Sequence, residues 1–420
     1  MQEPSQPLAV PTGGHHPLKD LISNRDFNLY TGARVCLPII QSAQAAVMTW
    51  QAYELSGSAL PIAILGLMRF VPGFAISLLA GAVVDTRDRR LVLALSQVAP
   101  LGTCLFLAII TAMGGVSLAA LYVCALLLGV FAAFEGPARE SLLPQLVPRE
   151  SFQRAVALTT TISQLARVVG PATAGVTIAQ VGVTPAYGFN VVVALACMAF
   201  VAVIRVRPES NPRGVVTLGL IKEGMVFVWT RPAILGAMTL DMLAVILAGA
   251  EALLPIYANE ILGTGAWGYG LLASSRAIGS FAMSLALAVL PPIERTGRAM
   301  VITVALFGVF TIAFGLSTSF PLSLALYALT AACDQVSVLM RQNIIQLGTP
   351  DALRGRVNSV NQMFIGTSNQ LGAFESGLLA TIANSAVFAV VAGGVGCLLA
   401  VGVVAVLIPG LWRHRTGLGA

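Results

Sequence analysis

Charged residues are scarce in this 420-residue sequence, at 10% of positions against 57% for hydrophobic residues. A chain so poor in charge is not a soluble globular domain. Histidine is almost absent, and its three copies (His15, His16 and His414) lie near the two ends. The sequence also has no phosphate-binding P-loop and no metal-ligand spacing. These gaps exclude ATP hydrolysis and predict a protein that is not an enzyme and has no metal and no cofactor.

Cysteine gives no support for a covalent or metal framework. All six cysteines fall inside apolar stretches without a Cys-x-x-Cys pair: Cys36, Cys104, Cys124, Cys197, Cys333 and Cys397. Neither a disulfide network nor a zinc site is indicated. The first 25 residues are polar and contain proline, so they do not resemble a cleavable signal peptide.

Long apolar stretches make up most of the sequence. A helix needs about twenty apolar residues to cross the hydrocarbon core of a membrane. The sequence predicts twelve such spans, at 27–53, 59–80, 91–113, 116–138, 152–180, 184–204, 233–259, 267–290, 299–316, 320–342, 357–382 and 386–409. This pattern predicts an all-α membrane protein of twelve transmembrane helices.

Basic residues alternate along the chain with these spans. All but four of the 24 lysine and arginine residues fall in the two tails or in every second loop, the exceptions being Arg34, Arg69, Arg167 and Arg276. Because basic loops stay in the cytoplasm, we expect both termini to be cytoplasmic. The net charge of +6 then reflects topology, and no nucleic-acid partner is expected. The outer loops are too short for a separate domain, and we expect a monomer in the lipid bilayer.

The longest polar connection divides the chain into two bundles. We expect a cytoplasmic tail at 1–26, a six-helix bundle at 27–204, a cytoplasmic linker at 205–232, a second six-helix bundle at 233–409 and a cytoplasmic tail at 410–420. Within the linker, residues 218–229 are typical of a short amphipathic helix that lies on the membrane surface.

The two bundles are weakly repeated in sequence. An offset of 202 residues pairs Arg139 with Arg341, Pro148 with Pro350, Arg154 with Arg356, Gly170 with Gly372 and Gly175 with Gly377. An offset of 207 residues pairs Arg69 with Arg276, Phe74 with Phe281 and Ser77 with Ser284. Two six-helix halves related by an axis along the membrane normal are one of the transporter architectures. The repeats therefore predict two pseudo-symmetric bundles.

The loop after the second span carries a motif. It reads Gly81-Ala-Val-Val-Asp85-Thr86-Arg87-Asp88-Arg89-Arg90 and resembles the Gly-x-x-x-Asp-Arg-x-Gly-Arg-Arg signature of the major facilitator superfamily. Gly81, Asp85, Arg89 and Arg90 match, whereas Thr86 and Asp88 depart. The resemblance implies that this loop holds the cytoplasmic side closed, with a carboxylate that faces the positive N-terminal end of a neighbouring helix.

The fifth span contains Gly170-Pro171-Ala-Thr-Ala174-Gly175, which resembles the Gly-Pro-x-x-Gly-Gly element of proton-driven exporters. Small residues let helices approach closely and proline bends a span, although the same residues also serve ordinary helix packing. Residues 50–59, 136–139, 353–358 and 372–377 further resemble the branch of twelve-span bacterial exporters that includes the enterobactin exporter and macrolide efflux proteins.

Polar residues inside the spans are the candidate site residues, because intramembrane charge is costly. In the superfamily, spans one, four, seven and ten line the cavity, and here they carry Arg34, Glu135 with Arg139, Asp241 with Glu251, and Asp334. A buried carboxyl group can be neutral at one cavity opening and ionised at the other, as proton coupling requires. We predict proton-coupling or substrate roles for Asp334, Asp241, Arg34, Glu135, Gln41 and Gln44. The alternatives are a static intramembrane ion pair, for example with Arg34, a local bridge between Glu135 and Arg139, and interhelical packing of the two glutamines.

A second pair of charges suggests a gate on the outer side. Arg69 on span two and Glu375 on span eleven lie at similar depths below the outer face. The superfamily architecture places these two spans against each other, and an ion pair across their interface would offset the cost of burial. We predict that the two residues pair when the outer side is closed. The alternative is that either residue faces cargo or pairs within its own half.

These features together indicate a bacterial inner-membrane exporter that works by alternating access. Inward proton flow would drive an organic molecule outward, and both a siderophore and an amphiphilic drug fit as cargo. Import or facilitated diffusion is the rival within transport, and the element at 170–175 argues against it. A lipid scramblase or a transport-dead sensor of the same fold is the rival from another class.

The charge pattern makes a direct prediction about topology. A reporter fused at Thr184, between spans five and six, should report the periplasm, whereas a reporter fused at Arg213 should report the cytoplasm. Alkaline phosphatase and green fluorescent protein fusions measure the two outcomes. The reverse assignment would contradict the whole map of spans.

Overall fold

The structure is a computed structural model that describes residues 23–148, 151–205, 218–291 and 293–413. All elements in these ranges are helical. The first half contains α2 (Arg25–Ser56), α3 (Ala59–Thr86), α4 (Arg89–Ser96), α5 (Val98–Ala112), α6 (Leu118–Leu146), α7 (Phe152–Val181) and α8 (Val183–Val203). The second half contains α10 (Pro232–Ala248), η2 (Glu251–Leu253), α11 (Leu254–Ile256), η3 (Tyr257–Ile261), α12 (Gly265–Val289), α13 (Thr296–Leu316), α14 (Phe320–Gly348), α15 (Asp351–Ile382) and α16 (Ala386–Leu407).

Each predicted span corresponds to a helix or to a run of consecutive short helices. Span three is α4 with α5, and span seven is α10 with the short elements up to Ile261. Among the described residues, nine helical segments are long and apolar enough to cross a membrane by length and composition alone. The spans outside that set, α2, α7 and α15, have a lower apolar content and carry polar side chains toward the interior. The prediction of an all-α membrane fold with twelve spans is confirmed.

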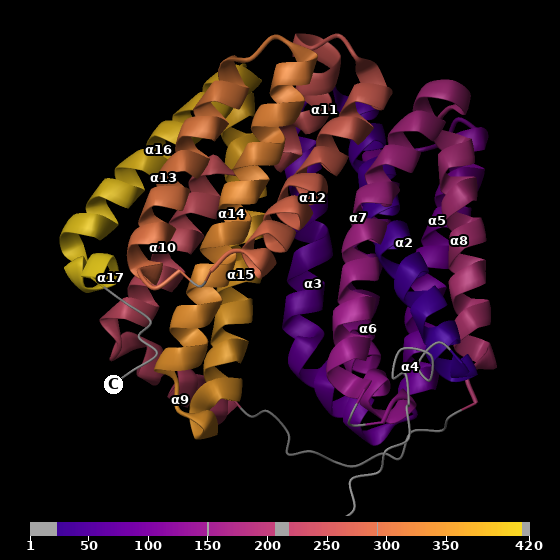
Figure 1. Ribbon diagram of the computed structural model, residues 1–420. Helices are drawn as coiled ribbons and strands as arrows, with labels where there is room; N and C mark the ends of the chain where they lie inside the picture. Colours follow the sequence, from indigo (N-terminus) through magenta and orange to yellow (C-terminus); the bar gives the residue numbers. More distant parts are fainter. Residues whose placement is uncertain (1–22, 149–150, 206–217, 292, 414–420) are drawn as a thin grey trace, which may run out of the picture.

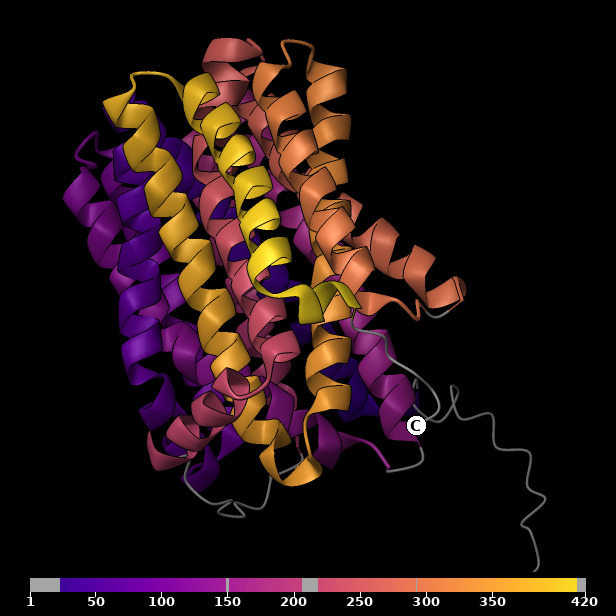
Figure 2. The ribbon, with the colours of Figure 1, turned by 90° about the vertical axis from the view of Figure 1, so that its left-hand side faces the viewer.

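The two six-helix halves lie side by side (Figure 1), and Figure 2 shows the second half from its own side. They meet through two pairs of helices, because α3 packs against α15 and α7 packs against α12. These are spans two with eleven and five with eight, the arrangement that the superfamily resemblance implies for span two. The central space therefore lies between the halves and is bounded by helices of both.

The linker ends in α9 (Leu218–Trp229), the short helix predicted from the sequence. It packs against α15, and Glu223 of α9 forms an ion pair with Arg356 of α15. A Cβ atom at Gly224 would lie 2.7 Å from the carbonyl oxygen of Arg356, so the two helices are in close contact at this point. The contact fixes the end of the linker to the second half.

Glycines allow the close helix contacts that shape the centre. A Cβ atom at Gly129 of α6 would lie 1.9 Å from the carbonyl oxygen of Arg69 on α3. On α7, a Cβ atom at Gly170 would lie 2.0 Å from Ser42 Oγ, and one at Gly175 would lie 2.6 Å from Gly270 Cα. No side chain fits at such distances, so these glycines hold α3 on α6, α7 on α2, and α7 on α12.

Span seven is broken near its middle. The regular helix α10 ends at Ala248, and the chain continues through the 3₁₀ turn η2 and the π-helical turn η3. The carbonyl oxygen of Gly249, freed by the break, accepts a hydrogen bond from Ser376 Oγ of α15. Because another helix satisfies this carbonyl, the break is tolerated within the membrane. It places Glu251 at the boundary between the halves.

The two halves are joined at the ends where α2 and η3 finish, which the predicted topology places on the outer side. Tyr53 donates its hydroxyl proton to Glu260 at 2.8 Å and accepts a hydrogen bond from Asn259 at 2.9 Å. Just below, the rings of Trp50 and Tyr269 stack with centroids 5.7 Å apart. At the inner end, the hydrogen bonds and ion pairs between side chains in the described part of the chain run within one half, as between α9 and α15. This conformation is closed on the outer side.

The glycine contact between α7 and α12 predicts how the outer side can be loosened. Gly175→Ala should push the two halves apart, whereas Gly136→Ala should not, because a Cβ atom at Gly136 meets no other atom within 4 Å. A single cysteine introduced at Ala273, on the cavity wall, reports opening through its reaction with an impermeant thiol reagent added from outside. We expect faster labelling in Gly175→Ala alone, and equal labelling in both variants would contradict the packing role.

Candidate functional site

A cavity of about 270 Å³ lies between the halves. In the first half its wall is formed by α2, α3, α6 and α7, and in the second by η2, α11, α12, α14 and α15. The polar wall residues include Ser42, Thr49, Arg69, Glu251, Tyr269, Arg276, Tyr327, Asn369 and Gln370. The apolar wall residues include Met48, Ile62, Leu65, Leu128 and Leu254. The cavity is therefore amphiphilic, with charged groups set among aliphatic side chains.

Three charged side chains stand on this wall. Arg69 comes from α3 in the first half, and Arg276 comes from α12 in the second. They are the two arginines that the 207-residue offset pairs in sequence. Glu251 comes from the break in span seven and lies within electrostatic range of both arginines. The repeated arginines thus approach one cavity from opposite halves, with a carboxylate near both.

Asp334 forms an ion pair with Arg276, one of these two arginines. Its Oδ2 atom lies 3.2 Å from Arg276 Nη2, and both side chains are only partly buried. Tyr327 lies on the same helix as Asp334. Tyr327 belongs to the cavity wall, and its hydroxyl is within electrostatic range of Arg276. Arg276 therefore has a direct ion-pair partner within its own half.

Asp241 lies elsewhere, in a closed part of the second half. Its carboxylate forms an ion pair with Arg341 and accepts a hydrogen bond from Ser337 Oγ at 3.1 Å. Both ion-pair partners are almost fully buried, and neither belongs to the cavity wall. The arrangement is the static ion pair weighed as an alternative, but its partner is Arg341 and not Arg34. The charge pattern counted Arg341 among the loop residues, which is wrong, because its side chain is 1% exposed inside α14.

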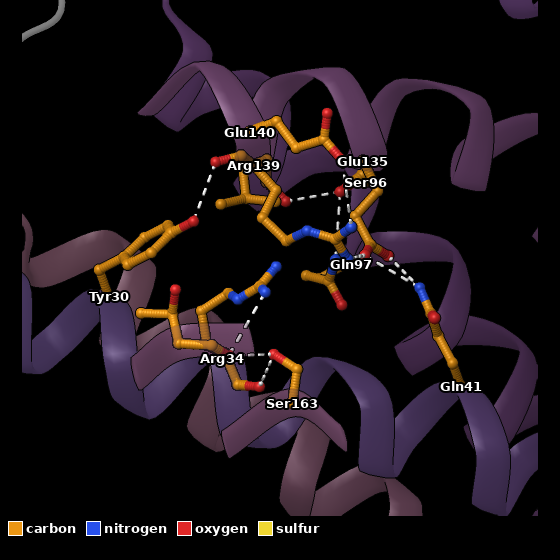
Figure 3. Close-up of polar contacts among 11 residues, drawn as sticks. Tyr30, Arg34, Gln41, Ser96, Gln97, Glu135, Arg139, Glu140 and Ser163 are labelled. Atoms are coloured by element: carbon orange, nitrogen blue, oxygen red, sulfur yellow. Dashed lines mark hydrogen bonds and ion pairs between the residues drawn. The ribbon is translucent and has the colours of Figure 1, made fainter. Parts of the chain in front are cut away.

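The first half holds a polar network near the inner end of α6 (Figure 3). Glu135 accepts two hydrogen bonds from Gln41 Nε2, at 2.9 and 2.8 Å, and forms an ion pair with Arg139 at 3.3 Å. Arg34 lies beside this network and donates from Nη2 to the carbonyl oxygen of Thr159 at 3.4 Å. The sequence candidates Arg34, Glu135 and Gln41 are thus brought together, and the local bridge between Glu135 and Arg139 is present.

A small space of about 10 Å³ lies between this network and the main cavity. Its wall includes Gln41, Gln44, Glu135 and Arg69. Gln44 donates a hydrogen bond to Thr103 Oγ1 of α5 at 2.8 Å, so its amide serves interhelical packing. Glu135 lies within electrostatic range of Arg69. Arg69 is therefore the residue that connects the polar network of the first half with the cavity.

The signature loop is described in part. Gly81 and Asp85 lie in the last turns of α3, and their side chains are outside the described part of the structure. Arg89 donates to the carbonyl oxygen of Ser141 at 3.2 Å, and Arg90 donates to the carbonyl oxygen of Ile204. Both arginines thus fasten the start of α4 to neighbouring helices of the same half. A gating role for these four residues stays a prediction.

Asp88, which departs from the family signature, has a clear local role. Its side chain accepts hydrogen bonds from the backbone N–H groups of Arg90 and Leu91, at 2.9 and 3.4 Å. It is therefore the N-cap of α4 and satisfies backbone donors that the first turn leaves free. The departure places a helix cap where the signature has glycine.

The predicted pair of Arg69 and Glu375 is not formed. The outer side is closed, yet these two described residues make no ion pair, and Arg69 lies on the cavity wall near Glu251. Glu375 lies half-buried on α15 and is not part of that wall. The prediction was wrong for this conformation because equal depth in two spans does not place two side chains on facing sides of their helices. Arg69 lies instead on the wall of the cavity between the halves.

Sequence reasoning noticed Glu251 and Arg276 as charges within spans but did not include them among the site residues. The sequence nevertheless carries a signal for each of these two residues. Glu251 follows Gly249 and precedes Pro255, so an acid sits between two helix-breaking residues in the middle of a span. Arg276 repeats Arg69, which makes both arginines candidates for one central position.

The fold and this site define a class of protein. Two six-helix halves with a charged cavity between them, together with the family match that follows, identify a transporter of the major facilitator superfamily and not an enzyme. The chain belongs to the family described as transmembrane secretion effector, which matches residues 33–411.

Named relatives and solved structures agree with this assignment. The chain is 28% identical over 379 residues to the multidrug efflux pump Tap of Mycolicibacterium fortuitum, covering 86% of this chain and 90% of that one. It is 26% identical over 342 residues to the enterobactin exporter EntS of Escherichia coli K12, covering 80% of each. The fold resembles the nucleoside transporter NupG, with a TM-score of 0.72 at 12% identity over 93% of this chain and 100% of that one. A bacterial homologue of the lysosomal transporter Spinster gives a TM-score of 0.63 at 13% identity, over 96% and 97% of the two chains.

The buried pair of Asp241 and Arg341 predicts a large effect on stability. Arg341→Met should lower the free energy of unfolding by about 3 kcal/mol, because it leaves an uncompensated carboxylate in the interior. The double variant Asp241→Leu with Arg341→Met should recover most of that loss. Thermal unfolding in detergent, followed by size-exclusion chromatography, measures both. If the double variant is no more stable than Arg341→Met alone, the pair is not a static structural contact.

Proposed function

We propose that this protein is a proton-coupled exporter of an organic molecule across the bacterial inner membrane, working by alternating access. The observation that carries the proposal is the central cavity, whose wall combines residues of both halves and whose outer side is closed by Tyr53, Glu260 and the Trp50–Tyr269 stack. Cargo that enters from the inner side would meet this cavity. Separation of the outer contacts would then release it on the other side.

The relatives support the outward direction. Tap is named as an efflux pump and EntS as an exporter, and each matches this chain over at least 80% of its length. The element at 170–175 points the same way, and its glycines lie where α7 meets α2 and α12. Both lines of support concern direction, and the cargo of a relative does not determine the cargo of this chain.

Coupling to protons is best placed at Asp334. Its carboxylate lies near mid-span, contacts Arg276, and keeps part of its surface open, as a group that exchanges protons must. Protonation removes the charge that holds Arg276 and so changes the cavity wall directly. Asp241 is a weaker candidate because its carboxylate is almost fully buried against Arg341 and away from the cavity. A change of charge at Asp334 thus reaches the cargo site through one contact.

The cytoplasmic loop would act on the conformational equilibrium and not on cargo. Arg89 and Arg90 bind carbonyl groups within the first half and lie outside the cavity wall. We infer that the loop biases which side is open, since a group that makes no cargo contact can change turnover only through the populations of the two states. The terminal tails and this loop would all lie in the cytoplasm.

Asp334→Asn should abolish transport driven by a pH gradient while the protein still reaches the membrane. The reason is that an amide keeps the shape of the carboxyl group but cannot exchange a proton. Uptake into everted vesicles, with and without an imposed pH gradient, measures the effect on a fluorescent drug and on a siderophore.

Asp241→Asn serves as the matched control, because it removes an acid from the same half without touching the cavity wall. It should retain proton-dependent efflux per folded molecule. Full proton-dependent efflux in Asp334→Asn would refute the coupling role. A wild-type protein that moves its cargo at the same rate with and without the gradient would indicate a scramblase or another uncoupled activity.

A further inference from the structure

The cavity wall carries more positive than negative side chains. Two guanidinium groups, Arg69 and Arg276, and one carboxylate, Glu251, are its charged members among the described residues. Arg69 makes no hydrogen bond and no ion pair with another described side chain, although Glu135 and Glu251 lie within electrostatic range. A guanidinium group within a membrane span is costly without a close counter-charge. The wall therefore offers a cation that lacks a direct partner.

Arg276 also retains capacity for a ligand. A guanidinium group has five N–H donors, and the contact with Asp334 uses Nη2. The planar group can bind a carboxylate or a phosphate through two parallel hydrogen bonds. Arg69 and Arg276 are related by the internal repeat and line one cavity from opposite halves, so an acidic group in the cavity meets a guanidinium group on either side.

The remaining wall residues indicate which other chemical groups such a ligand would carry. Thr49, Tyr269, Tyr327, Asn369 and Gln370 supply neutral hydrogen-bonding groups. Met48, Ile62, Leu65, Leu128 and Leu254 supply aliphatic surface. A ligand that satisfies this wall has one acidic head and an apolar body.

We propose that the cargo is an amphiphilic organic anion whose acidic group is bound by Arg69 and Arg276. This inference rests on the proposed transport function of the cavity and adds the charge of the cargo to it. Glu251 is the carboxylate of the cavity wall, and it lies within electrostatic range of both arginines. An incoming oxyanion takes over that position, so Glu251 opposes cargo binding and keeps the two arginines from holding the cargo permanently.

Three probes of similar shape and different charge test this proposal. They are 2-naphthylacetate, its uncharged amide and 2-naphthylethylamine, and their intrinsic fluorescence reports binding to the full-length protein in lipid nanodiscs, with empty nanodiscs as the blank. We expect the acid to bind about tenfold or more tightly than the amide, and the amine to bind most weakly. A hydrogen-bonded charge pair commonly contributes that much to affinity.

Single substitutions on the cavity wall test which charges of the protein bind or repel the acid. Arg69→Gln and Arg276→Gln should each weaken binding of the acid by about tenfold and leave the amide unchanged, whereas Glu251→Gln should strengthen binding of the acid. Arg167→Gln is the control, because it removes an arginine from a span without touching the cavity wall. It should leave all three affinities as they are, and equal melting temperatures show that each variant is folded.

Every other pattern overturns the proposal. Equal affinity for acid and amide would show that the arginines do not recognise charge. Tighter binding of the amine, lost in Glu251→Gln, would show a cation site. The proposed function fails separately: a protein that binds the acid but moves it without regard to the pH gradient is not proton-coupled. Proton-driven efflux of the amine alone would keep the exporter and refute the anionic cargo.

Discussion

The cost of an electric charge within the hydrocarbon core controls this structure. A charged side chain there must meet an opposite charge, a set of hydrogen bonds or water. Asp241 with Arg341 and Glu135 with Arg139 and Gln41 satisfy this constraint inside single halves. Three further charges, on Arg69, Glu251 and Arg276, lie on the wall of the cavity between the halves. The same constraint thus accounts for the ion pairs within each half and for the placement of the other charges at the cavity between the halves.

Residues at equivalent positions in the two halves do not always carry the same charge. Arg34 is the tenth residue of α2 and Asp241 is the tenth residue of α10, so equivalent places carry opposite charges. In the second half Asp241 forms a closed pair with Arg341, whereas in the first half Arg34 lies near Arg139, the equivalent of Arg341. Like charges at these places require Glu135 nearby and leave a more open polar network. Arg69 and Arg276, by contrast, keep both position and charge, which suits a ligand held between two similar halves.

The fold was predictable because each span must be about twenty residues long and apolar, and because basic loops alternate. Even α9 was predicted with its observed bounds, since its amphipathic pattern is local. The partners of charges were not predictable in the same way. Depth along a span follows from counting residues, but the direction of a side chain depends on how packing rotates each helix. Arg69 therefore lies on the cavity wall, within electrostatic range of Glu135 and Glu251, and makes no ion pair with Glu375. Arg341, close to a predicted span end, is buried against Asp241.

We propose that the two halves rock about the charged cavity, so that one side closes as the other opens. Electron paramagnetic resonance distances between spin labels test it directly, with one pair at Met113 and Ile382 on the outer ends and another at Glu140 and Leu347 near the inner ends. All four side chains are exposed and belong to opposite halves within each pair. When the buffer is changed from alkaline to acidic, we expect a second population of molecules to appear, with a longer distance between the outer labels and a shorter distance between the inner labels. Distances that change in the same direction, or that do not change at either end, would contradict it.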